Sequence, residues 1–215
     1  MNLWIKICGN TSLEDARLAA DAGADAVGFV FAPSPRRITA EQAAAIVPHL
    51  PAALEKIGVF VDASFDEIAK TVETAGLTGA QLHFNAEPEL AALLRARFGP
   101  ALRILHVLHF DAKAVLPELD VNVDGVLIDS RTATAVGGTG KTFDWAAASK
   151  TLFQNGNTGK LIAAGGLTPQ NVAEAIATLR PWGVDVVSGV ETAPGRKDPE
   201  KVRAFIANAR ATHRS

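Results

Sequence analysis

The sequence contains a single cysteine, Cys8, so no intrachain disulfide can form. It has no run of about 18 apolar residues that could cross a membrane, and no N-terminal apolar stretch long enough for a secretory signal. The formal net charge is -2 and no block of Lys or Arg occurs, which argues against nucleic acid as a partner. We therefore expect a cytoplasmic protein with neither membrane nor nucleic acid as partner. By itself, a lone cysteine is more often a small buried apolar residue than a nucleophile or base.

Short apolar stretches alternate with longer segments rich in Ala, Leu and Glu along the 215 residues. This alternation predicts strands at residues 3–8, 26–31, 56–61, 80–83, 104–108, 125–129, 161–164 and 185–187. It predicts helices at residues 13–22, 40–47, 65–75, 87–97, 112–116, 145–152, 169–179 and 199–211. Thr39 with Gln42 three residues later resembles a capping box. Thr168 and Asp198 each precede a proline, which suits a cap followed by proline at the first helical position.

Strict alternation of strands and helices predicts a parallel sheet with helical crossovers. Eight such units favour a closed barrel, so we expect an α/β fold, a (βα)8 TIM barrel, formed as one domain by residues 1–215. An open doubly wound sheet is the alternative. No G-x-G-x-x-G follows the first strand, however, where a dinucleotide site would require it.

Polar residues gather where the predicted strands end. In such barrels the active site forms at the carboxyl ends of the strands. Cys8 ends the first strand, His83 the fourth and Asp129 the sixth, while Arg36 follows the second. Because strand side chains alternate, Lys6 and Cys8 face the interior if Ile5 and Ile7 face the helices. By the same argument Leu127 and Asp129 face inward.

Two glycine-containing loops predict a phosphate site. Gly165 and Gly166 follow the seventh strand, and Ser188 and Gly189 follow the eighth, the region where barrels of this type often bind phosphate. Glycines let backbone N–H groups approach an anion near a helix N-terminus. The alternative is that these glycines only make tight turns. Residues 137–142 look like a P-loop, but Ala135 stands where its first glycine should be, so we reject that interpretation.

Motifs along nearly the whole chain resemble those of the phosphoribosylanthranilate isomerase family. They are, in order, residues 6–9, 28–31 with 34–36, 58–61, 81–83, 127–130, 137–145, 165–172 and 184–191. The resemblance implies an Amadori rearrangement of N-(5-phosphoribosyl)anthranilate to 1-(2-carboxyphenylamino)-1-deoxyribulose 5-phosphate in tryptophan biosynthesis. It also implies a small-molecule substrate and neither a metal nor an organic cofactor. A different phosphosugar isomerase barrel and a non-catalytic phosphosugar-binding scaffold are the alternatives.

By position, Cys8 matches the family's general base, Asp129 its general acid and Arg36 the arginine that holds the anthranilate carboxylate. His83 and Asp185 match polar residues near the substrate. Three of them have a simpler interpretation: a strand-end turn former or helix cap for Asp129, a surface ion pair for Arg36 and a hydrogen-bonded rim residue for His83. The neighbouring Arg37 also competes with Arg36 for the assignment.

The proposed chemistry requires unusual protonation states. An ordinary aspartic acid is about 0.1% protonated at pH 7, and an ordinary thiol is only a few per cent ionised. We therefore expect the barrel to raise the pKa of Asp129 and to lower that of Cys8. Lys6 either favours the thiolate or serves as a structural ion-pair partner.

Two positions depart from the family pattern. Phe84 replaces the usual glycine after His83, and Val187 stands where a serine commonly precedes Ser188. The first departure leaves the geometry of His83 open, and the second removes a hydroxyl near the phosphate. We expect a monomer.

Overall fold

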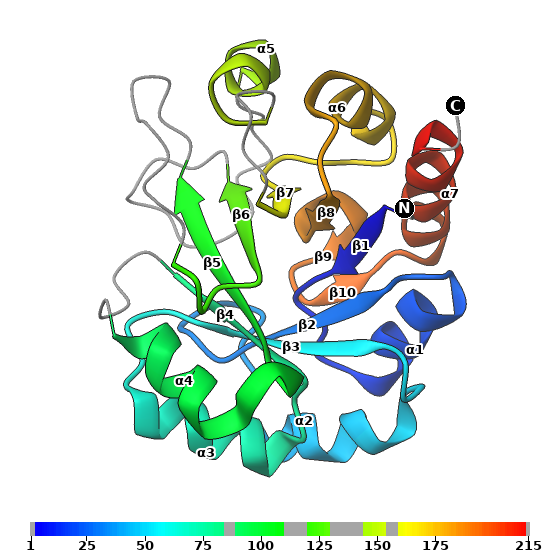
Figure 1. The fold of residues 1–215 in the computed structure, drawn as a ribbon. Helices are drawn as coiled ribbons and strands as arrows, with labels where there is room; N and C mark the ends of the chain where they lie inside the picture. The colour runs from blue at the N-terminus through cyan, green and yellow to red at the C-terminus, as the bar shows by residue number, and fades with distance from the viewer. Residues whose placement is uncertain (1–2, 84–88, 110–119, 130–143, 154–158, 214–215) are drawn as a thin grey trace.

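The computed structural model describes residues 3–83, 89–109, 120–129, 144–153 and 159–213. Its strands form a closed barrel in the order β1 to β8, and every neighbouring pair is parallel. The strands are β1 Trp4–Ile7, β2 Ala26–Val30, β3 Glu55–Phe60, β4 Gly79–Leu82, β5 Arg103–His109, β6 Gly125–Asp129, β7 Leu161–Ala163 and β8 Gly183–Val186. β1 pairs with β8 and closes the ring (Figure 1). The predicted barrel is confirmed.

Helices surround the barrel (Figure 1). They are α1 Leu13–Asp21, α2 Ala40–Ile46, α3 Phe65–Ala75, α4 Leu90–Phe98, α5 Trp145–Ala148, α6 Val172–Leu179 and α7 Pro199–His213. A π-helical segment, Ser149–Phe153, continues α5, and the short 3-10 helices are η1 Val47–His49, η2 Gly99–Ala101 and η4 Ser188–Val190. A small antiparallel hairpin, β9 Glu191–Ala193 with β10 Arg196–Lys197, follows β8. The helix predicted at 112–116 lies outside the described residues.

Two of the three predicted helix caps are confirmed. Thr39 and Gln42 form the predicted capping box of α2. Asp198 accepts hydrogen bonds from the backbone N–H groups of Glu200 and Lys201, so α7 begins at Pro199 as predicted.

The predicted start of α6 is wrong. The helix begins at Val172, three residues beyond Pro169. Asn171 explains the delay, because its side chain accepts a hydrogen bond from the Thr168 N–H and donates one to the carbonyl of Gly166. These bonds hold residues 166–171 as a loop above the end of β7.

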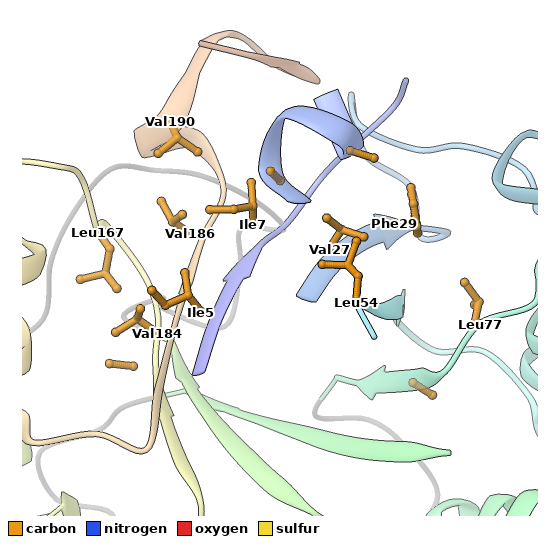
Figure 2. Packing of buried hydrophobic residues seen from close by; sticks show 14 of the residues in the cluster. Ile5, Ile7, Val27, Phe29, Leu54, Leu77, Leu167, Val184, Val186 and Val190 are labelled. Carbon is orange, nitrogen blue, oxygen red and sulfur yellow. The ribbon is translucent and has the colours of Figure 1, made fainter. Parts of the chain in front are cut away.

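Strand side chains form two apolar layers. Ile5 and Ile7 belong to a cluster with residues of β2, β8 and the surrounding helices, and Figure 2 shows them beside Val184 and Val186 of β8. The inner layer contains Trp4, Ala26, Ile57, Leu105, Val107, Leu127, Ile162 and Ala164. The predicted alternation is therefore confirmed for both β1 and β6.

Among the helices of the described residues, none is long and apolar enough to cross a membrane.

Candidate active site at the carboxyl ends of the strands

Cys8 lies directly beyond β1 and is 3% exposed. Its backbone N–H donates to the carbonyl of Val186, which ties the end of β1 to β8. Val30 and Val59 pack near its thiol in a small apolar cluster at the barrel mouth. Gly28 on β2 provides the room, because a Cβ there would lie 2.5 Å from the Cys8 Sγ.

Lys6 crosses the barrel interior below Cys8. Its ammonium donates to the Gln81 Oε1 of β4 at 2.8 Å and to the Asp185 Oδ1 of β8 at 2.9 Å. The side chain is completely buried, as the inward orientation predicted. The ion-pair interpretation of Lys6 is therefore correct. It also places Asp185, a predicted substrate residue, in a buried contact with Lys6.

The pKa values of this cluster follow from burial and charge. Burial raises the pKa of the Cys8 thiol above its ordinary value, although the positive charges of Lys6 and Lys197 oppose the increase. Burial lowers the pKa of Lys6, but the neighbouring Asp185 and Cys8 outweigh it and raise the Lys6 pKa overall. Our expectation of a lowered Cys8 pKa is wrong. Desolvation by the apolar cluster outweighs the two cations.

Asp129 is the last residue of β6. It lies two positions after the inward-facing Leu127, and side chains two positions apart on a strand share a face. It lies opposite His109 in the register between β5 and β6. His83 directly follows β4, and its ring lies 6.5 Å from that of His109, centroid to centroid. His109 is not among the predicted site residues, because the predicted fifth strand ends one residue too early, at Leu108.

Arg36, in the loop after β2, forms a buried ion pair in place of the surface pair considered above. Its Nε donates to both oxygens of Glu191 at 2.9 and 3.1 Å, and its Nη2 donates to Oε2 at 2.6 Å. Lys197 donates to the Oε1 of Glu191 at 3.0 Å and to the Cys8 carbonyl at 2.6 Å. The motif at 184–191 includes Glu191, but sequence reasoning assigned no role to it or to Lys197.

The predicted phosphate loops meet at the ends of β7 and β8, which are neighbours in the barrel. Gly165 and Gly166 have φ angles of 78° and 67°, a left-handed conformation that favours glycine. A Cβ on Gly189 would collide with the backbone carbonyl oxygen of Leu167. Ser188 and Gly189 form the start of η4. The tight turns of these two loops therefore account for the glycines at 165, 166 and 189. The anion site stays a prediction.

In the described ranges, no group of three or more His, Cys, Asp or Glu side chains could hold a metal ion. Val187 packs beside the apolar cluster around Cys8. Phe84 and the rejected P-loop at 137–142 lie outside the described residues.

Comparison with known proteins identifies the family. The model of the N-(5'-phosphoribosyl)anthranilate (PRA) isomerase family matches residues 5–208. This chain belongs to the phosphoribosylanthranilate isomerase family. The family expected from the motifs, an isomerase family of tryptophan biosynthesis, is therefore confirmed.

Individual members of the phosphoribosylanthranilate isomerase family match over nearly their full length. The enzyme named N-(5'-phosphoribosyl)anthranilate isomerase in Geobacter sp. (strain M21) is 46% identical, over 96% of this chain and 97% of that protein. The solved phosphoribosyl anthranilate isomerase of Thermus thermophilus is 40% identical, with a TM-score of 0.84 over 96% and 98% of the two chains. Another solved member, in complex with reduced 1-(o-carboxyphenylamino)-1-deoxyribulose 5-phosphate, is 32% identical, with a TM-score of 0.80 over 97% and 99%.

Proposed function

We propose that this chain catalyses the Amadori rearrangement of N-(5-phosphoribosyl)anthranilate, with Asp129 as general acid and Cys8 as general base. The observation that carries the proposal is the placement of these two residues. Cys8 lies directly beyond the carboxyl end of β1 and Asp129 is the last residue of β6, at the same end of one barrel. An acid and a base at one barrel mouth are what the reaction requires.

In the first step, the carboxylic acid of Asp129 gives its proton to the ribose ring oxygen. The bond between C1 and that oxygen breaks, and the nitrogen lone pair forms a C=N double bond to C1. The ring is then open, and the nitrogen carries a positive charge. Proton donation to the leaving oxygen makes ring opening possible without a metal.

In the second step, the thiolate of Cys8 removes the proton from C2. The C–H bonding electrons form a C1=C2 double bond, and the electrons of the C=N bond return to nitrogen, giving an enolamine. The enol then loses its hydroxyl proton while C1 gains a proton, which yields the ketone product. No redox partner is needed, because the oxidation of C2 is balanced by the reduction of C1.

Substrate binding involves the remaining predicted residues. We assign Arg36 to the anthranilate carboxylate, which suits the planar geometry of a guanidinium. The loops with Gly165, Gly166, Ser188 and Gly189 would bind the phosphate through backbone N–H groups. His83 directly follows β4, and Asp185 is the next-to-last residue of β8, close to the same ends of the strands.

Lys6 supports the base in this proposal. A thiol with a raised pKa is mostly protonated near neutral pH, so the reactive thiolate is a minority form. The Lys6 ammonium, whose charge and hydrogen bonding favour the thiolate, increases its population. Lys6 then acts both as the ion-pair partner of Asp185 and as a stabiliser of the reactive Cys8.

The test is loss of phosphoribosylanthranilate fluorescence on addition of the purified chain. Rapid, saturable turnover supports the proposal. A parallel assay offers the aldose substrate of the imidazole pathway, which represents the alternative phosphosugar isomerase. Turnover of that aldose alone would replace the proposed substrate, and binding without turnover of either compound would favour a non-catalytic scaffold.

We also propose that the enzyme acts in the cytoplasm as a monomer. In the parts of the chain that the structure describes, Leu93 and Val121 are the large apolar side chains that are exposed. Two isolated residues do not make an apolar surface of the size that a stable dimer buries. Light scattering on the purified protein at micromolar concentration checks this; a mass of twice 22.5 kDa would contradict it.

A further inference from the structure

A buried three-residue cluster connects the candidate base to the candidate carboxylate-binding arginine. It consists of Arg36, Glu191 and Lys197, whose side chains are 7%, 4% and 0% exposed. Glu191 and Lys197 come from the β9–β10 hairpin, which places them beside the ends of β1 and β2. Charges are rarely buried unless they are paired, so this arrangement needs an explanation.

Glu191 occupies one edge of the Arg36 guanidinium. All three of its bonds to Arg36 use Nε and Nη2, and they leave Nη1 out. A guanidinium carries five N–H donors in a planar fork, so the edge formed by Nη1 and Nη2 can still bind a second carboxylate. In the described part of the chain, no hydrogen bond uses Nη1. The backbone of Gly9 lies close to the Arg36 side chain, because a Cβ on Gly9 would be 2.7 Å from the Arg36 Cδ.

Lys197 connects this arginine to Cys8. Its ammonium donates to the Glu191 Oε1, to the Cys8 carbonyl at 2.6 Å and, at 3.5 Å, to the Val187 carbonyl. The Lys197 Nζ is therefore surrounded by three acceptors, and it has three hydrogens to donate to them only when it is protonated. Burial lowers the pKa of Lys197, and the charge of Glu191 opposes that decrease. With Lys197 protonated, two cations and one anion leave the cluster with a net charge of one positive, which a single substrate carboxylate would neutralise.

We propose that Glu191 and Lys197 are positioning residues that hold the guanidinium of Arg36 and the backbone of Cys8 as one unit, with the free edge of Arg36 directed to the anthranilate carboxylate. This inference rests on the proposed function. Neither residue touches the reacting atoms, and Glu191 acts through Arg36. Their effect is to fix where the carboxylate binds relative to the base that removes the C2 proton.

The test compares two substrates in Glu191→Gln: phosphoribosylanthranilate and N-(5-phosphoribosyl)aniline, which lacks the carboxylate. We expect kcat/KM to fall about 10- to 100-fold for the first, mainly through KM, and only a few-fold for the second. Lys197→Met should reduce the same preference for the carboxylate-bearing substrate. A purely structural role would lower kcat/KM equally for both substrates, and that result would overturn the proposal.

Two further variants complete the design. Glu55→Gln is the matched control, because Glu55 pairs with the Nε and Nη2 of Arg103 in the same manner, at 2.6 and 2.7 Å, near the amino-terminal ends of β3 and β5. It should leave the substrate preference unchanged. In the Arg36→Met background, Glu191→Gln should cause no further change in the preference between the two substrates, since Glu191 affects carboxylate binding through Arg36, whereas any effect through Lys197 applies to both substrates alike.

This double variant removes both ends of the Arg36–Glu191 ion pair and leaves Lys197 an amide oxygen as acceptor, which reduces the cost of unpaired buried charge, so it tests the proposal even if Glu191→Gln alone does not fold. A further loss of substrate preference in the double variant, relative to Arg36→Met, would contradict the proposal. Absence of wild-type turnover of phosphoribosylanthranilate would instead contradict the proposed function. A normal wild-type rate with an unchanged preference in Glu191→Gln would contradict this inference alone.

Discussion

Replacing Gly28 by alanine should disable the proposed base while leaving the barrel folded. The added Cβ would lie 2.5 Å from the Cys8 Sγ, 3.0 Å from the Lys6 Cε and 3.1 Å from the Cys8 Cα. Ordinary van der Waals contact begins at 3.4 Å, so the sulfur must move by about 0.9 Å, the difference between 2.5 and 3.4 Å. A displacement of about 1 Å at a reacting group can lower the rate by about 100-fold.

The stability cost of the same substitution is moderate. Adding a methyl group to a tightly packed interior typically costs about 1–3 kcal/mol, which a barrel of this size should survive. We therefore expect Gly28→Ala to retain a cooperative unfolding transition in urea while kcat/KM, measured by loss of substrate fluorescence, falls about 100-fold.

Gly58→Ala is the matched control for Gly28→Ala. A Cβ on Gly58 would lie 2.7 Å from both the Leu77 Cδ1 and the Phe60 Cε2, on the outer face of β3. It should lower the unfolding free energy by a similar amount and leave kcat/KM nearly unchanged. Normal activity in Gly28→Ala, or an equal loss of activity in both variants, would refute the reasoning.

Three further predictions concern other parts of the molecule. Because burial raises the pKa of Cys8, the ultraviolet absorbance of its thiolate should appear at higher pH than that of a free thiol; Lys6→Met should shift this rise to still higher pH, and a rise at or below the pH of a free thiol would contradict the raised pKa. Ser64→Ala removes the cap of α3 and should lower the unfolding free energy in urea by about 1 kcal/mol, with kcat/KM unchanged. Gly189→Ala would force its loop away from Leu167, so it should weaken competitive inhibition by inorganic phosphate; an unchanged inhibition constant would remove Gly189 from the phosphate site.

The sequence predicted the features that depend on local periodicity. Alternating burial along a strand is a property of its own residues, which is why the inward direction of Lys6 and Leu127 was correct. Capping of α2 by Thr39 and of α7 by Asp198 likewise involves side chains within three residues of the backbone groups they bind.

The features that the sequence did not predict depend on contacts between distant segments or on solvation. The start of α6 is delayed because Asn171 binds the loop at Gly166, a contact that competes with the Thr168-Pro169 start signal. Arg36 and Glu191 are 155 positions apart, and only the folded β9–β10 hairpin brings them together. The pKa of Cys8 rises because its apolar surroundings desolvate it, and a sequence does not reveal how strongly neighbouring cations compensate.

The most direct test of the central claim is to measure turnover and binding separately in Cys8→Ala and Asp129→Ala. The binding probe is reduced 1-(o-carboxyphenylamino)-1-deoxyribulose 5-phosphate, an analogue of the proposed product. If the two residues are the base and the acid, kcat falls by about 10²–10⁴ in each variant while the Kd of the analogue changes only a few-fold. Variants that keep kcat within about tenfold of wild type, or that lose analogue binding as strongly as turnover, would contradict the account.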